Sequence, residues 1–127
     1  MRYTHDTWSI DLPNNWVVEE TDEAMAFYNP DGVGAIQIST YIKENGNVSK
    51  EDLLEFSEVE NPDEADLPYL NGIQKNTEDG GDIFINWWLR SGSQLFYVTY
   101  ICEKGDESIE AEEREYVVYS LRPHNVE

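Results

Sequence analysis

Apolar and polar residues alternate along several short stretches of the chain, which is the pattern of a strand with one buried face. In the first stretch Trp8, Ile10 and Leu12 lie on one face, and the residues between them are polar. Segments rich in proline, asparagine, aspartate and glycine separate the stretches, and these residues favour turns. The pattern therefore predicts four strands, at residues 8–12, 16–18, 24–28 and 35–42.

Three further strands are expected in the second half of the chain, at residues 70–76, 83–90 and 94–102. The turn at residues 78–81 contains two glycines and joins the first two of them. The last two strands carry β-branched and aromatic residues on both faces, as a pleated surface favours. We therefore expect them at the centre of a sheet, with at least one face fully covered.

A first helix is predicted to begin after Ser49. Ser49 occupies the N-cap position, and Asp52 stands at the reciprocal position of a capping box. The apolar stripe of this helix consists of Leu53, Leu54 and Phe56. Pro62 ends the segment, and we expect residues 58–68 to be acidic and irregular.

A second helix is expected at residues 108–121, with Asp106 or Ser108 as its cap. Acidic residues crowd its first turns, which the helix dipole favours, and Pro123 ends it. The face expected to be buried consists of Ile109, Tyr116, Val117, Ser120 and Leu121.

The order of these elements is four strands, a helix, three strands and a helix (ββββ-α-βββ-α). Short hairpin links favour an antiparallel arrangement, and each helix must bury its apolar stripe against the sheet. We therefore predict an α+β fold, an antiparallel meander β-sheet of about six to seven strands flanked by two helices. The 127 residues fit a single domain that spans residues 1–127.

A resemblance to a known superfamily rests on four segments, in chain order WSIDLPNNW, FYNPDGVGAIQIS, WWLRSGSQLFYVTYIC and a closing helix that ends in YVVYSLRP. Together they resemble the α/β sandwich shared by PsbP of photosystem II, the Ran guanine-nucleotide release factor and bacterial DcrB-like proteins. The resemblance covers nearly the whole chain and is closest to small bacterial domains of unknown function in that fold. It implies a non-enzymatic binding protein, in which Trp8 and Trp16 would be packing residues.

Charge narrows the classes of partner. The chain has 27 acidic and 8 basic residues, a formal net charge of -19. Nucleic-acid binding needs lysine and arginine for the phosphates, so we expect none, and an anionic membrane is disfavoured for the same reason. A basic protein would be attracted by this field. Solubility or a salty environment are alternative reasons for the acidity.

Residues for catalysis or for a cofactor are scarce. Cys102 lies in an apolar strand without a basic neighbour, so we expect a buried, unreactive thiol. His5 and His124 lie near opposite ends of the chain, and we expect both to be solvated tail residues. There is no nucleophile elbow and no glycine-rich phosphate loop. We therefore predict no enzyme and no cofactor.

Calcium is the main alternative ligand because carboxylates are abundant. Residues 76–82 superficially suggest a calcium loop, but the bidentate glutamate expected downstream is missing. We interpret this segment as a hairpin turn. The acids at residues 63–66 offer a second, looser calcium ligand set, for which a solvated loop is the preferred interpretation.

Two acidic surfaces remain as candidates for partner binding, at residues 51–66 and 103–115. Exposed aromatic residues would strengthen either surface, because tyrosine and tryptophan anchor interfaces. Candidates of this kind are Tyr69, Trp88, Tyr97 and Tyr119, with core packing as the preferred interpretation for Trp88 and Tyr97. The predicted partner-binding residues are Glu55, Glu58, Glu60, Asp63, Glu64, Asp66, Glu110, Glu113, Tyr69 and Trp88.

The predicted function is that of a non-enzymatic, acidic domain that binds another protein. The negative charge favours a partner with a basic surface. Its two concrete forms are an immunity-type protein that neutralises a basic toxin and a chaperone-like adaptor for a secreted effector. A small-molecule or calcium-binding domain is the alternative. No apolar run has the length of a signal peptide or of a membrane span, so we expect a cytoplasmic protein.

Overall fold

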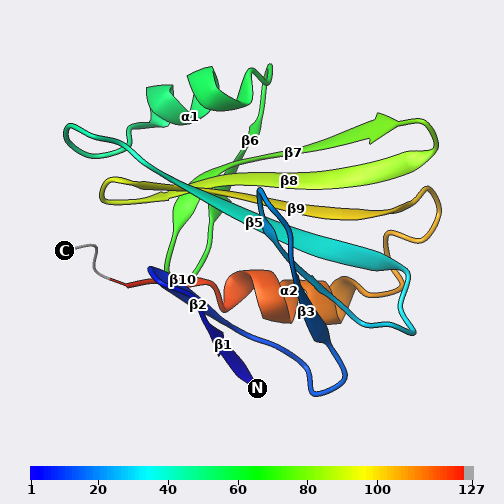
Figure 1. The fold of residues 1–127 in the computed structure, drawn as a ribbon. Helices are drawn as coiled ribbons and strands as arrows, with labels where there is room; N and C mark the ends of the chain where they lie inside the picture. Colours follow the sequence, from blue (N-terminus) through cyan, green and yellow to red (C-terminus); the bar gives the residue numbers. More distant parts are fainter. Residues whose placement is uncertain (125–127) are drawn as a thin grey trace.

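The computed structural model describes residues 1–124 and shows an α+β fold with two antiparallel sheets (Figure 1). The large sheet has seven strands, in spatial order β3 (Val17–Glu20), β4 (Met25–Tyr28), β5 (Gly34–Ile42), β9 (Gln94–Glu103), β8 (Asp82–Ser91), β7 (Asn71–Asp79) and β6 (Asp63–Asp66). The small sheet consists of β1 (Arg2–Thr4), β2 (Trp8–Asp11) and β10 (Arg122–Pro123). The helices found in residues 1–124 are α1 (Lys50–Ser57) and α2 (Ala111–Tyr119).

The predicted fold class is confirmed, and the strand order needs a correction. Residues 8–12 were expected in the meander, but β2 belongs to the second sheet, between β1 and β10. The short strands β1, β6 and β10 were not predicted. Two of them, β1 and β10, exist because they pair with β2, and β10 comes from the far end of the chain. β1 is a three-residue strand in a hairpin with β2, too short for an alternation pattern, and the long-range pairing of β10 leaves no local pattern.

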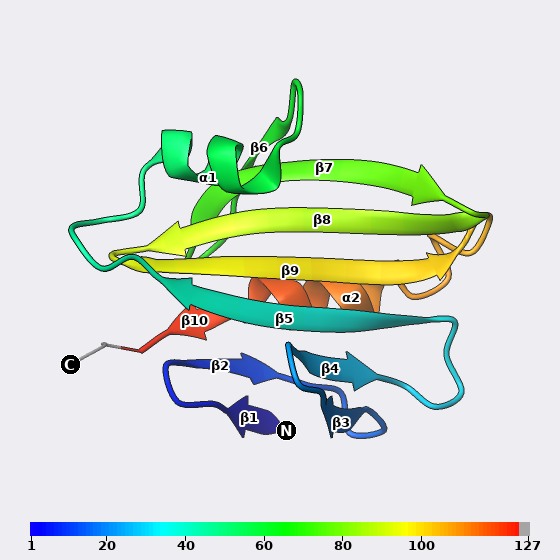
Figure 2. The same cartoon turned by 45° about the horizontal axis from the view of Figure 1, so that its top comes forward.

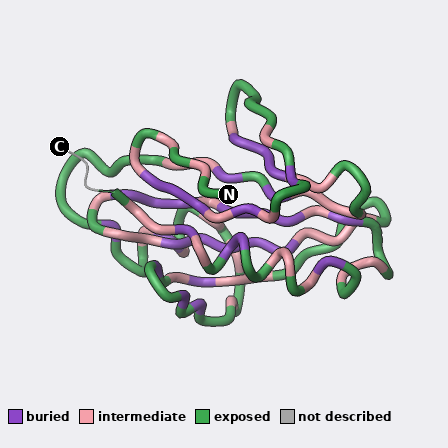
Figure 3. The backbone as a smooth tube through the Cα atoms, turned by 90° about the horizontal axis from the view of Figure 1, so that it is seen from below, coloured by how far each residue is buried: buried purple, intermediate pink, exposed green. Residues whose placement is uncertain are grey.

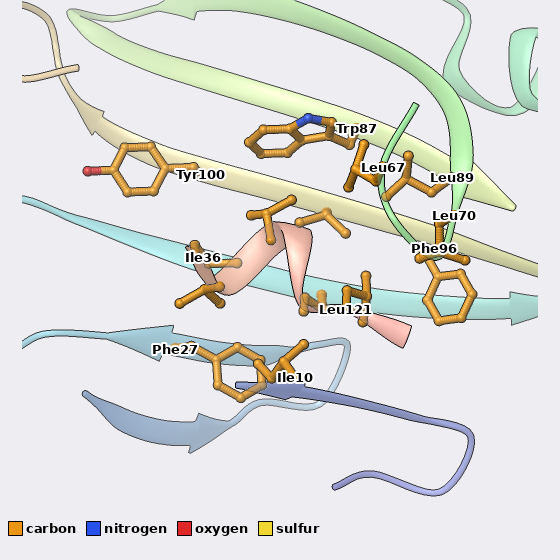
Figure 4. Close-up of a cluster of buried hydrophobic side chains, with 14 of the residues drawn as sticks. Ile10, Phe27, Ile36, Leu67, Leu70, Trp87, Leu89, Phe96, Tyr100 and Leu121 are labelled. Atoms are coloured by element: carbon orange, nitrogen blue, oxygen red, sulfur yellow. The ribbon is translucent and has the colours of Figure 1, made fainter. Parts of the chain in front are cut away.

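Helix α2 lies beside the small sheet, on the same face of the large sheet, so that α2 and β2 together form the layer that packs on the large sheet (Figures 1 and 2). Val117, Val118 and Leu121 are buried there, in one cluster with Ile10 of β2 and Phe96 of β9. Figure 4 shows Ile10, Phe96 and Leu121 among the side chains of this cluster. Buried positions are concentrated along the middle strands, and exposed positions gather in the turns (Figure 3).

Helix α1 covers one end of the opposite face of the large sheet. Its Leu53 is fully buried against Ile73, Trp88 and Leu95. Trp88 is only 6% exposed, and its ring stacks on Tyr97 with centroids 5.4 Å apart. The expectation that Trp88 serves as an exposed anchor for a partner is therefore wrong, because α1 covers this part of the sheet.

The capping box that begins α1 is confirmed. The backbone N–H of Asp52 donates to Ser49 Oγ over 3.1 Å, and the N–H of Ser49 donates to Asp52 Oδ2 over 2.8 Å. Lys43 Nζ also contacts Asp52 Oδ2 at 2.8 Å. The predicted apolar stripe is only partly correct, because Phe56 is exposed.

Helix α2 is shorter than predicted and its buried face is different. It begins at Ala111, and neither Asp106 nor Ser108 caps it. Ile109 is exposed because it lies in the turn before the helix, where helical spacing does not apply. Tyr116 is exposed as well, and Val118 takes the buried position instead.

Glu110, at the entrance to α2, is buried and holds three parts of the chain together. Its Oε1 accepts hydrogen bonds from the N–H of Val33 (3.1 Å), the N–H of Gly34 (2.9 Å) and the hydroxyl of Tyr100 (2.9 Å). A Cβ on Gly32 would overlap the other carboxylate oxygen, which explains the glycine there. Glu110 was predicted to bind a partner, and this is corrected because the side chain is 4% exposed and bonded internally.

We predict that Glu110→Ala lowers the free energy of unfolding by about 3 kcal/mol, because two backbone N–H groups and a phenol lose their acceptor. Urea denaturation measures the loss. Glu112→Ala, which removes an exposed carboxylate from the same helix, should change it by less than about 0.5 kcal/mol. Equal losses in the two variants would contradict this role of Glu110.

We also predict that the pKa of Asp52 depends on Lys43. The hydrogen bond from Lys43, followed by the Ser49 N–H, lowers the pKa of Asp52 from 3.8 to about 2. The capping box therefore stabilises the fold above about pH 4, and this contribution is lost as the pH falls through the lowered pKa. Carboxyl NMR titration should show the pKa rising towards its ordinary value in Lys43→Met. It should stay low in the control Lys50→Met, because Lys50 pairs with Glu64 instead.

Candidate partner-binding surface

The acids predicted around α1 lie on an exposed surface that runs from α1 to the edge strand β6. Glu58 follows the helix in a left-handed conformation, and β6 continues the acidic run as a strand where an irregular segment was expected. In this surface Glu64 pairs with Lys50 at 3.0 Å. The exposed predicted residues here are Glu55, Glu58, Glu60, Asp63, Glu64 and Asp66, and their role in binding stays a prediction.

Glu113 has a structural partner. Its Oε2 accepts a hydrogen bond of 2.9 Å from Trp16 Nε1, which fastens the segment before β3 to α2. The carboxylate is half-buried, in contrast to the exposed Glu112 beside it. Trp16 itself is buried, as expected of a packing residue.

A groove of about 460 Å³ lies between α2 and the segment that precedes β7. We call it the tyrosine groove, and its lining residues are Asp11, Pro68, Tyr69, Glu112, Glu115, Tyr116, Tyr119, Ser120 and Arg122. Its three tyrosines are among the exposed large hydrophobic side chains of residues 1–124, at 53% for Tyr69, 53% for Tyr116 and 43% for Tyr119.

The helix determines which of its residues reach the groove. Glu112, Glu115, Tyr116 and Tyr119 follow the spacing i, i+3, i+4 and i+7, so they share one face of α2. The valines at 117–118 occupy the opposite, buried face. The exposed face of α2 therefore presents two carboxylates and two phenols side by side.

The groove already contains one cation. The guanidinium of Arg122 lies over the Tyr69 ring, 5.6 Å from its centroid, and its Nη2 donates to Asp11 Oδ1 over 2.8 Å. The backbone N–H of Asp11 donates in turn to Ser120 Oγ over 2.7 Å, which joins β2 to the end of α2. A carboxylate and a tyrosine face thus hold a guanidinium group between them at this end of the groove.

Sequence reasoning found this groove only in part. Tyr69 was predicted as a partner-binding residue and Tyr119 as an exposed aromatic, and both lie in the groove. Tyr116 was expected in the core, although its i+4 spacing from Glu112 was a usable signal for an exposed face. Arg122 was missed because its position depends on β10, a strand formed only by long-range pairing.

A second, smaller groove of about 210 Å³ separates the end of β5 from α1. The rings of Tyr41 and Phe56 meet there with centroids 4.9 Å apart, and both side chains are exposed, as is Ile42. Val48 and Leu95 form its apolar floor. We call this the apolar groove, since it is more apolar in character than the tyrosine groove.

The cysteine, the histidines and the serine beside His124 do not form an accessible catalytic site. Cys102 is buried, and burial raises the pKa of its thiol, which disfavours the reactive thiolate. The prediction of solvated histidines is wrong for His5, which is half-buried and stacks on Trp8, whereas His124 is exposed as predicted, with its Nε2 3.1 Å from Ser9 Oγ. Since Ser9 is 1% exposed, a substrate would have no access to its hydroxyl.

Metal ligands do not gather in the part of the chain that the structure describes. No group of three or more histidine, cysteine, aspartate or glutamate residues within 1–124 is arranged to hold a metal ion. Residues 76–82 form the end of the β7–β8 hairpin, with Gly80 and Gly81 at positive φ in the turn, as the turn interpretation predicted. No helix in residues 1–124 combines the length and apolar character needed to cross a membrane.

Comparison with known proteins supports the fold and leaves the family open. No family model matches the chain, and no curated protein matches it either. A crystal structure of a protein from Bacteroides thetaiotaomicron VPI-5482 is similar, with a TM-score of 0.75, 22% identity and coverage of 93% of this chain. This chain spans 45% of the length of that protein.

A second similar structure is that of the cyanobacterial PsbP protein, CyanoP, from Synechocystis sp. PCC 6803. Its TM-score is 0.50 at 8% sequence identity, and the match covers 98% of this chain and 92% of CyanoP. The predicted resemblance to PsbP is thus supported at the level of the fold, and the chain has a PsbP-like α+β architecture.

Proposed function

We propose that this protein is a non-enzymatic binding domain that uses the tyrosine groove to hold a segment of another polypeptide. The observation that carries the proposal is the convergence of three exposed tyrosines and two unburied glutamates on one groove. Tyrosine suits an interface because it offers a large apolar face together with a hydroxyl that can form hydrogen bonds. Neither the core nor the capping of α2 requires these side chains.

Charge supports a partner with a basic surface. At a net charge of -19 the protein attracts cations over long range, and its field would speed the association of a basic protein. Nucleic acid stays disfavoured because its phosphates carry the same sign of charge. An immunity-type protein that neutralises a basic toxin is the form of this function that the groove and the charge favour together. A cytoplasmic location remains a prediction.

A chaperone-like adaptor is the second candidate, and the apolar groove is the observation in its favour. Tyr41, Ile42 and Phe56 expose apolar surface to solvent beside α1, where an apolar segment of an effector could bind. Binding there would depend little on salt, whereas binding of a basic segment at the tyrosine groove would weaken as salt screens the charges. The calcium alternative gains no candidate site from residues 1–124.

The groove tyrosines should be dispensable for folding. We predict that Tyr116→Ser and Tyr119→Ser each change the free energy of unfolding by less than about 0.5 kcal/mol, since both side chains are exposed and serine has a similar helix propensity. Val118→Ala should cost about 2 kcal/mol, because it removes buried methyl groups from the same helix. Urea denaturation compares the three. A large loss in the tyrosine variants would mean that these residues serve the fold.

Partner binding should depend on one groove and on salt. We predict that a partner retained from native lysate by the wild-type protein is lost with Tyr116→Ser/Tyr119→Ser and at high salt, but kept with the control Tyr41→Ser/Phe56→Ser. Pull-down with quantitative mass spectrometry measures the retention. Loss only in the control, without salt dependence, would favour the adaptor. Retention by both variants would contradict a role for either groove.

A further inference from the structure

Resting on the proposed function, we propose that the tyrosine groove is a guanidinium-binding site and that its occupant is an extended polypeptide segment with two arginines. The inference depends on the juxtaposition of acid–tyrosine pairs along one face of α2 with an arginine that is already bound at the end of the same groove.

Arg122 shows how the groove binds a guanidinium group. Its charged end is held between the face of Tyr69 and the carboxylate of Asp11, by a cation–π contact of 5.6 Å and a hydrogen bond of 2.8 Å. Arg114 makes a similar contact elsewhere, with its guanidinium 4.9 Å from the centroid of Tyr100. Tyrosine faces in this protein are thus used to bind guanidinium groups.

Helix α2 repeats the same two components without a cation. Glu112 precedes Tyr116 by four residues and Glu115 precedes Tyr119 by four, so each carboxylate lies next to a phenol ring on the helix surface. Within residues 1–124 neither glutamate forms an ion pair, and both are exposed. Two acid–tyrosine pairs in the groove are therefore available to a cation supplied by a partner.

Arginine fits these pairs better than lysine does. A guanidinium group is planar and weakly hydrated, so it can stack on a phenol ring while it donates hydrogen bonds to a carboxylate in its own plane. An ammonium group is compact and strongly hydrated, and it does not stack in this way. A preference for arginine over lysine therefore distinguishes binding at these acid–tyrosine pairs from a general attraction of positive charge.

The spacing of the two pairs indicates the form of the occupant. Side chains three positions apart on a helix lie about 5–6 Å from one another. Alternate residues of an extended strand point to the same side about 6.6 Å apart. One extended segment with the pattern Arg-X-Arg can therefore place a guanidinium group at each pair.

Fluorescence anisotropy with three labelled probe peptides tests the inference. The peptides share one neutral Gly/Ser sequence and carry Arg-Gly-Arg, Lys-Gly-Lys or the neutral isostere citrulline-Gly-citrulline. We expect the arginine peptide to bind most tightly, and Glu112→Gln/Glu115→Gln to weaken it about tenfold. The control Glu55→Gln/Glu58→Gln removes the same charge from α1 and its C-terminal end, and should change the affinity less than about twofold. Tyr116→Ser/Tyr119→Ser should abolish the difference between arginine and lysine.

Two outcomes would overturn the inference and leave the proposed function standing. The first is equal binding of the arginine and lysine peptides with equal losses in both glutamate variants, which would indicate attraction by net charge alone. The second is no peptide binding while the retained protein partner still depends on Tyr116 and Tyr119. A partner that does not depend on these tyrosines overturns the proposed function instead.

Discussion

The buried carboxylate of Glu110 is the interaction on which the rest of this architecture depends. It accepts three hydrogen bonds from the start of β5 and from β9, at the residue where α2 begins. Burying this carboxylate would be costly without hydrogen bonds, so the three contacts of its Oε1 help to fix where α2 starts and how it is turned. The rotation of α2 in turn decides that its valines enter the core and that Tyr116 and Tyr119 face the groove.

Negative charge has more than one role in this protein. Glu110, Glu113, Asp52 and Asp11 each accept hydrogen bonds that join separate segments, so part of the acidity serves the fold. Glu112 and Glu115 form no ion pair within residues 1–124 and lie beside exposed tyrosines on α2. A count of acidic residues is therefore a weak indicator of binding, whereas the neighbours of each carboxylate separate structural acids from available ones.

The similarity to CyanoP at 8% identity shows that the same arrangement of layers can be built from a largely different set of residues. Layers of strand and helix can be kept while nearly every residue changes, provided that the apolar faces meet. Function cannot be transferred between proteins of such low sequence identity, because function depends on the residues of a site and not on the arrangement of layers. The tyrosine groove is accordingly argued from the residues of this chain alone.

The sequence by itself determined the elements that local patterns encode. Alternation located the long strands, Ser49 and Asp52 marked the start of α1, and the paired glycines at 80–81 marked the β7–β8 turn, because each of these signals acts between near neighbours in the chain. Only the tertiary structure decided that β2 leaves the meander for a second sheet, that α2 packs beside this sheet on one face of the large sheet, and that Glu110 is internal while Glu112 is exposed. The tyrosine groove belongs to the second group, because it joins Asp11, Tyr69, α2 and Arg122 from distant parts of the chain. Long-range strand pairing and the rotation of a packed helix bring these residues together. Neither can be inferred from the spacing of residues that are close in sequence.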